Sequence, residues 1–347
     1  MQQRFLTNLS LLVGGTFAAL AAMALEAQAQ TVLRMNNWLP AQHSQLVGTM
    51  KPWAEAVEKA TNGRVKIELT AASLGAPPRQ YDLAVDGIAD ITFGVHGYTP
   101  GRFKLTAVAE LPFMGDSGEA LSVALWRVHE KFFKKANEHK GVVLLGIYAH
   151  RPGTIMTASA PIASLADYKG RKIRVGGGIV QQINPALGGV NVAASANEVY
   201  ELLSQGVVDG TLLPSEAYSS FKLEGVIKYE TTIPGGLYSS TWFAVMNRDA
   251  FDKLSPEDQK ALMSVSGENL ARLGGRTFDE ADKAAIKVME EKGVKRITAD
   301  AAFVKDIQDK LAFLNDTWIK DAEKLKVDGK AALQMMREEA KAYKPSN

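Results

Sequence analysis

Among the side chains able to bind an anion, Arg174 stands in the most informative setting. It lies between Ile173 and Val175, where a polar, glycine-broken turn runs into an apolar, strand-like stretch. Because side chains alternate between the faces of a strand, Ile173 and Val175 point to one face and Arg174 to the other. A guanidinium is always charged, and its rigid fork of donors fits a carboxylate. Arg174 is therefore a candidate anion clamp if its face lines a cleft, and a surface arginine on a half-exposed strand if it does not.

Side chains suited to covalent or metal chemistry form no recognisable catalytic pattern. The sequence contains neither the Gly-x-Ser-x-Gly turn of many hydrolases nor the His-Glu-x-x-His pattern of zinc proteases. It has no cysteine, which excludes disulfides, thiolate metal ligands and a cysteine nucleophile. The five histidines are not spaced like zinc ligands: His43, His96, His129, His139 and His150. We therefore expect a protein that is not an enzyme and needs no cofactor.

The composition is that of an ordinary soluble protein. A chain of 347 residues is long enough for roughly two domains with substantial cores. Hydrophobic residues make up 46% and charged residues 22% of it. The formal net charge of +2 is close to balance, and no basic tract is interleaved with aromatic residues. Nucleic acid is therefore not an expected partner.

The N-terminus has the pattern of an export signal. Arg4 supplies positive charge, residues 11–25 are apolar and rich in alanine, and Ala27-Gln28-Ala29 forms a small-x-small cleavage site. A retained membrane anchor is the alternative, but the apolar stretch is short and a cleavage pattern follows it. We therefore expect residues 1–29 to be a signal peptide cleaved after Ala29, and the mature protein to lie in the periplasm.

The remaining pattern predicts the elements that would position Arg174. Strand-like stretches at 31–35, 65–70 and 89–93 alternate with helical patterns near 53–60 and 80–86, which predicts an α/β fold with mostly parallel strands. The strand-like stretch 142–148 runs into Pro152-Gly153, a candidate hinge between domains. The plan then repeats from 154 to about 239. Residues 241–246 are again strand-like and a candidate return to the first domain, and the chain beyond Ser255 is largely helical.

Several short segments, in the same order along the chain, carry a family resemblance. The chain resembles the solute-binding proteins of tripartite ATP-independent periplasmic (TRAP) transporters, the DctP family. The matching segments are 59–65 (KATNGRV), 73–75 (SLG), 87–91 (GIADI), 111–113 (LPF), 169–175 (KGRKIRV), 198–200 (EVY) and 205–210 (QGVVDG). Each is weak alone, but together they extend over most of the mature chain.

The resemblance implies a two-domain fold of the periplasmic-binding-protein type, type II-like, with hinge strands and a long domain-spanning helix. We expect the first domain to hold residues 30–150 and about 241–280, and the second to hold 151–240 and about 281–347. A ligand would be enclosed in the cleft between them by hinge closure. The resemblance further implies a monomer that delivers its ligand to the small and large TRAP membrane subunits.

The resemblance also implies roles for individual residues. The arginine at position 174 usually forms a bidentate salt bridge with a ligand carboxylate, and a second arginine, at position 151, often reaches the cleft. The family's ligand-binding asparagine is replaced here by Leu213 in Thr-Leu-Leu-Pro. Because a leucine cannot pair a second polar ligand group, we expect a monocarboxylate with an apolar or aromatic body, not a dicarboxylate or a sugar acid. Other aromatic residues suit a pocket wall or plain core packing: Trp38, Tyr218 and Tyr238 first, then Tyr98, Tyr148 and Trp242.

Four alternatives stay open beside this interpretation. A metal ion bridges protein and ligand in some relatives, and Glu216 and Gln182 are the side chains that would take part here, although no metal site is predicted. A sensory protein that passes its ligand-bound state to a receptor would use the same cleft. An exported hydrolase or the binding protein of an ATP-driven transporter fits the sequence less well.

Overall fold

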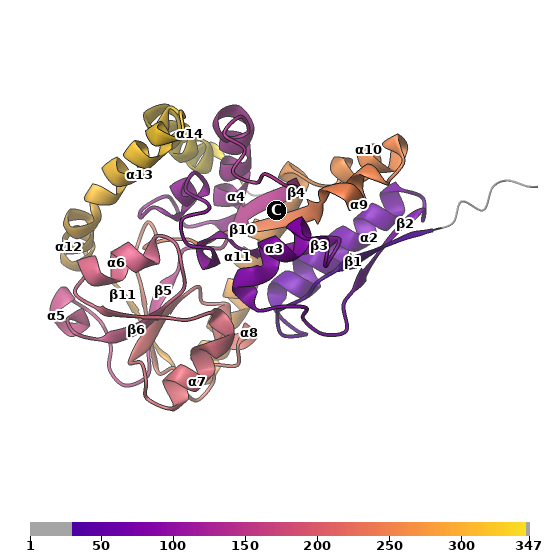
Figure 1. Ribbon diagram of the computed structural model, residues 1–347. Helices are drawn as coiled ribbons and strands as arrows, with labels where there is room; N and C mark the ends of the chain where they lie inside the picture. Colours follow the sequence, from indigo (N-terminus) through magenta and orange to yellow (C-terminus); the bar gives the residue numbers. More distant parts are fainter. Residues whose placement is uncertain (1–29, 345–347) are drawn as a thin grey trace, which may run out of the picture.

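The computed structural model describes residues 30–344 and contains two mixed β-sheets (Figure 1). The expected signal peptide, residues 1–29, lies outside the described part of the chain. The first sheet has the order β2-β1-β3-β10-β4 and the second β11-β9-β5-β8-β6-β7. This two-sheet α/β architecture confirms the predicted fold class.

The strands of the first sheet come mainly from the first half of the chain: β1 Thr31–Met35, β2 Val65–Leu69, β3 Ile91–Val95, β4 Val142–Ala149 and β10 Thr241–Asn247. Those of the second sheet are β5 Thr154–Thr157, β6 Lys172–Val175, β7 Val190–Ala193, β8 Gly210–Leu213, β9 Tyr229–Thr232 and β11 Lys295–Thr298. Each sheet has a strand antiparallel to both of its neighbours, namely β10 and β5. The other strands of each sheet share one direction, as the alternation of strands and helices predicts.

The antiparallel strands β5 and β10 are also where the chain crosses between sheets. Residues 150–153 lead from β4 in the first sheet to β5 in the second, and residues 233–240 lead from β9 back to β10. The Pro152-Gly153 break therefore lies in a crossing segment, and strand 241–247 returns to the first sheet, as the sequence predicts.

Short helices accompany the first sheet: η1 Leu46–Met50, α2 Lys51–Ala60, η2 Pro77–Arg79, α3 Gln80–Val85, η3 His96–Tyr98, η4 Thr106–Glu110, α4 Gly118–Val128, η5 His129–Phe133, α9 Arg248–Asp252 and α10 Pro256–Ser264. Those of the second are α5 Leu165–Tyr168, α6 Val180–Ala186, η6 Ala196–Glu198, α7 Val199–Ser204 and α8 Ala217–Ser220. Ser255 caps α10 by accepting a hydrogen bond from the Asp258 backbone N–H, as its position before Pro256 predicts.

The 24-residue helix α11 (Glu268–Glu291) connects the two halves. Near its N-terminal end it packs on α4, and Gly275 allows this because an added Cβ would lie 2.4 Å from the Gly118 carbonyl oxygen. Further along, Asp282 Oδ1 accepts a 2.6 Å hydrogen bond from the Glu216 backbone N–H beside the second sheet. This is the long connecting helix that the family resemblance implies.

The C-terminal helices α12 Ala301–Leu311, α13 Phe313–Lys324 and α14 Gly329–Ala342 form an arc along one side of the molecule (Figure 1). Helix α12 contacts α5 and α6, whereas α14 packs on α4 beside the first sheet. The sequence-based boundaries assign residues 281–347 to the second domain. This assignment stays a prediction. Within residues 30–344, no helix combines the length and apolar character needed to cross a membrane.

Candidate ligand-binding site

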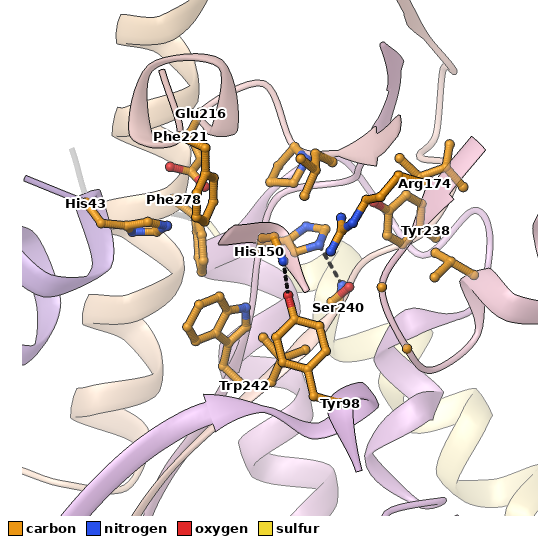
Figure 2. A pocket seen from close by; sticks show the side chains of 18 of the residues that line it. His43, Tyr98, His150, Arg174, Glu216, Phe221, Tyr238, Ser240, Trp242 and Phe278 are labelled. Carbon is orange, nitrogen blue, oxygen red and sulfur yellow. Dashed lines mark hydrogen bonds between the residues drawn. The ribbon is translucent and has the colours of Figure 1, made fainter. Parts of the chain in front are cut away.

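A pocket with about 510 Å³ of space between its atoms lies where the two halves of the chain meet (Figure 2). Trp38, Tyr98 and Trp242 line it from elements of the first sheet, and Arg174 and Leu213 from strands of the second. Enclosed pockets with mostly apolar walls and few polar groups are typical sites for small organic ligands. The strand ends and crossing segments therefore converge on a candidate ligand-binding site.

Arg174 is the charged group at the centre of this candidate site. It lies on β6 between Ile173 and Val175, which are fully buried in the core on the other face of the strand. The Arg174 side chain is only 1% exposed, and its Nε and Nη2 donate to the Ala194 carbonyl oxygen at 3.1 and 2.8 Å. Among residues 30–344, no carboxylate lies within the 4.0 Å of an ion pair with this guanidinium. A buried cation thus borders the pocket without a protein counter-ion.

Stacked aromatic rings form one wall. Trp38 stacks on Trp242 with ring centroids 5.6 Å apart at 19°, and Trp242 stacks on Tyr148 at 6.1 Å and 16°. The Trp38 Nε1–H donates to the Phe93 carbonyl oxygen at 2.9 Å, which fixes the ring, and Tyr98 meets the Trp38 edge at 6.0 Å and 71°. Tyr148 is fully buried behind these rings and does not line the pocket, so Trp38, Tyr98 and Trp242 form the wall that suits the face or edge of a planar apolar body.

Of the side chains that the sequence suggests for the site, Arg174, Trp38, Leu213 and Tyr238 line this pocket. Tyr218 does not line it, because the short helix α8 turns its ring into the apolar cluster around Met156 and Leu223. The secondary aromatic candidates Tyr98 and Trp242 do line it.

The expectation that Arg151 reaches the same cleft is not met in the structure. Arg151 borders a separate small pocket, where its Nε donates to the Asp116 carbonyl oxygen at 3.0 Å and lies 3.9 Å from Asp282 Oδ2. The physical reason is the turn that follows the end of β4: the His150 side chain enters the ligand pocket, whereas the Arg151 side chain is turned toward the Asp116 carbonyl oxygen and Asp282.

The two side chains suggested for a bridging metal are not brought together. Glu216 lines the pocket, where its Oε2 accepts hydrogen bonds from Ser44 Oγ at 3.0 Å and Ser220 Oγ at 2.5 Å. Gln182 is exposed on α6 and does not line the pocket. In the described part of the chain, no three His, Cys, Asp or Glu side chains group as metal ligands would.

Two of the five histidines, His43 and His150, line the pocket, and of these only His150 stood out in the sequence as a residue near the cleft. His150 Nε2 accepts a 2.9 Å hydrogen bond from the Ser240 backbone N–H, and its Nδ1–H donates to the Arg151 carbonyl oxygen. Burial lowers the pKa of His150 to about 4, so the ring is neutral at pH 7. His43 lies in the loop after β1, and burial also lowers its pKa. Its position beyond the carboxyl end of a strand is the signal that points to such residues in α/β sheets.

Contacts between the two halves surround the pocket. Tyr98 Oη accepts a 2.9 Å hydrogen bond from the Ala196 backbone N–H, and Asn197 Nδ2 donates to the Trp38 carbonyl oxygen at 3.2 Å. The backbones of Gly97 and Gly177 touch, since a Cβ on Gly177 would lie 1.5 Å from the Gly97 carbonyl oxygen. The described conformation is therefore one in which both halves enclose the pocket.

Two sheets joined by crossing strands around an enclosed, partly charged pocket define a two-lobed binding protein. The family model "Bacterial extracellular solute-binding protein, family 7" (DctP) matches residues 35–321. The chain belongs to this family, whose members serve TRAP transport as solute-binding proteins and not as enzymes. The family assignment based on the sequence is thereby confirmed.

Individual relatives are similar over nearly their whole length. The "Outer membrane transporter protein TsaT" of Comamonas testosteroni is 34% identical over 94% of this chain and 97% of its own. A TRAP periplasmic solute-binding protein of Bordetella bronchiseptica, solved with bound (R)- and (S)-mandelate, is 43% identical, with a TM-score of 0.88 over 90% of this chain and 99% of its own. A marine metagenome TRAP solute-binding protein specific for aromatic acids, solved with 3-hydroxybenzoate, is 32% identical, with a TM-score of 0.85 over 91% and 99%.

Proposed function

We propose that this protein captures an aromatic monocarboxylate for a TRAP transporter, with Arg174 binding the carboxylate and the tryptophan stack binding the ring. The observation that carries the proposal is the buried Arg174 guanidinium, which borders the aromatic pocket without a carboxylate of the protein. A buried, unpaired charge is costly, and a ligand carboxylate would compensate it with charge-assisted hydrogen bonds. The solved relatives that hold mandelate or 3-hydroxybenzoate support this class of ligand.

The apolar side of the pocket restricts the ligand further. Leu213 lies on the wall at the end of β8, where it offers no hydrogen bond to a second polar group. The aromatic neighbours Trp38, Trp242 and Phe278 add to this apolar surface. A dicarboxylate or a sugar acid would leave polar groups unpaired there, at about 1–3 kcal/mol for each.

Capture would proceed by closure of the two halves around the ligand. The ligand favours the closed state only by its greater affinity for that state, to which Arg174 from the second sheet and Trp38 from the first would both contribute. The closed protein would then deliver the ligand to the membrane subunits of the transporter. In this proposal the protein works in the periplasm after removal of residues 1–29.

A thermal-shift screen of the mature protein, from Gln30 onward, against a library of organic acids tests the proposal. A ligand at a hundred times its dissociation constant stabilises the folded state by about 2.7 kcal/mol, which raises the melting temperature measurably. We expect aromatic monocarboxylates to give the largest shifts, and Arg174→Ala to abolish them.

The matched control is Arg171→Ala, which removes a partly exposed arginine next to the same strand. It should leave the shifts unchanged. Shifts with dicarboxylates or sugar acids alone, or shifts that persist in Arg174→Ala, would contradict the proposal.

A further inference from the structure

The pocket holds two buried N–H donors that no residue of the described chain satisfies. They are His43 Nε2 and Trp242 Nε1, and both residues line the pocket. Buried donors almost always have a partner, because leaving one unpaired costs free energy. Neither of them is used by the proposed contact between Arg174 and a carboxylate, so the pocket has hydrogen-bonding capacity beyond that contact.

The hydrogen bonds of His43 fix which of its nitrogens carries the proton. Its Nδ1 accepts a 3.1 Å hydrogen bond from the Gln45 backbone N–H and must therefore be unprotonated. His43 is 1% exposed, and its ring is neutral at pH 7 because burial opposes the charge. The single ring proton thus lies on Nε2, which makes this atom a donor. Phe221 holds the ring edge-on, with centroids 5.0 Å apart.

The donor lies far from the carboxylate position and close to an acceptor. Figure 2 shows His43 on the opposite side of the pocket from Arg174, with Glu216 and Phe221 on the His43 side. Glu216 is the acidic residue of the pocket wall, and its charge acts on the His43 ring. The hydroxyl groups of Ser44 and Ser220 both donate to Glu216 Oε2. No hydrogen bond from residues 30–344 reaches Glu216 Oε1. This side of the pocket therefore offers one donor and one acceptor.

We propose that this part of the pocket recognises a hydroxyl group on the ring of the ligand, remote from its carboxylate. The inference rests on the proposed function, since it assumes that Arg174 binds the carboxylate. The hydroxyl oxygen accepts from His43 Nε2–H and its proton is donated to Glu216. A hydroxyl group satisfies both partners at once, whereas a second carboxylate meets the negative charge of Glu216 and an unsubstituted ring leaves both partners unpaired. The ligand class is a hydroxylated aromatic monocarboxylate.

Isothermal titration calorimetry with matched acids tests this inference. The probes are benzoate, phenylacetate and the ortho, meta and para hydroxy derivatives of each. We expect at least one hydroxy acid to bind the wild-type protein about tenfold or more tightly than its parent acid, because a site built around a hydroxyl group discriminates against an analogue that lacks it. In His43→Phe and Glu216→Leu, which remove the donor and the acceptor respectively, this ratio should fall to near one, while the parent acid still binds.

Binding of the parent acid by each variant also shows that the variant is folded. Trp242→Phe is the matched control, since it removes the other unpaired N–H and keeps an aromatic ring; the hydroxy preference should survive in it. A preference that is lost in Trp242→Phe but kept in His43→Phe would overturn the assignment, and so would equal binding of hydroxy and parent acids by the wild type. If the wild type binds none of the acids, the proposed function itself fails.

Discussion

At the residue scale, neighbours in the fold decide what an arginine does. Arg174 and Arg151 are both candidates for binding the same carboxylate on resemblance, yet only Arg174 borders the pocket. Arg174 is held by the Ala194 carbonyl oxygen, which leaves part of its donor fork for a ligand. Arg151 is occupied by the Asp116 carbonyl oxygen and lies near Asp282. The two side chains have the same chemistry and different partners.

This difference predicts unequal effects of the same substitution. Arg174→Lys keeps the positive charge but removes the planar fork, so we expect affinity for the best acid of the screen to fall about 10- to 100-fold. Arg151→Lys should change it less than about threefold, because a side chain outside the pocket touches no ligand. Calorimetric titration of both variants measures this. Equal losses would mean that the ligand reaches Arg151 as well.

At the element scale, enclosure of the pocket depends on two backbone segments that come close only because both carry glycine. Gly97 lies in η3 after β3, and Gly177 lies in the loop after β6. A Cβ on Gly177 would lie 1.5 Å from the Gly97 carbonyl oxygen, far inside the contact distance. The two segments follow strands of different sheets. The contact between them therefore depends on how closely the two halves of the protein approach each other.

Gly177→Ala should therefore hinder the enclosed arrangement without removing any ligand contact. We expect the variant to bind the best acid about tenfold or more weakly, because ligand binding must then overcome the clash between the loops. Small-angle X-ray scattering should give a larger radius of gyration for the ligand-saturated variant than for the saturated wild type.

Gly176→Ala is the neighbouring control. Its added Cβ would lie 3.5 Å from Tyr98 Cε1 and 3.7 Å from Arg174 Nη2, both ordinary contacts, so the radius of gyration of the ligand-saturated variant should stay close to wild type. Wild-type affinity in Gly177→Ala would show that the glycine contact has no part in binding.

At the scale of the whole molecule, buried histidines make stability depend on pH. Burial lowers the pKa of His96 to about 3 and those of His129 and His150 to about 4, against an ordinary value of 6.5. The unfolded chain therefore binds more protons below pH 6.5 than the folded protein does. The stability that these neutral histidines contribute is fully present above pH 6.5 and is lost as the pH falls toward 4. Buried Glu110 and Asp282, whose pKa values are raised by burial, act in the opposite direction.

A single substitution isolates one of these contributions. His129 stacks on Trp126, and its Nδ1 is buried without a hydrogen-bond partner among residues 30–344. His129→Phe keeps an aromatic ring and removes the titrating group. Below pH 6.5 its free energy of unfolding should exceed that of the wild type by an amount growing at roughly 1.4 kcal/mol per pH unit, down to about pH 4.

Urea unfolding of both proteins from pH 7.5 to pH 4.5 measures the difference. The values at pH 7.5, where the ring is neutral in both folded and unfolded states, provide the offset caused by packing alone. Parallel stability curves would mean that His129 titrates normally in the folded protein.

The amino-acid sequence by itself determined the types of the elements and the family. Strand β6 with Arg174 opposite Ile173 and Val175, the caps of helices such as α10, and the crossing at Pro152-Gly153 follow from patterns within a few residues. Side-chain alternation, helix capping and turn formation depend on residues that are close together in the chain, so they can be predicted from the sequence. The sequence also favoured a carboxylate ligand with an apolar body, through Arg174 and Leu213.

Only the tertiary structure decided which side chains share the pocket. Trp38, His43, Arg174 and Trp242 come from distant segments, and their proximity depends on how the two sheets and the crossing strands pack. The same packing turned Tyr218 into the core and Arg151 into a separate pocket. It also left the N–H groups of His43 and Trp242 without partners. A hydrogen-bond partner or its absence is a property of three-dimensional neighbours, and no spacing along the chain specifies it.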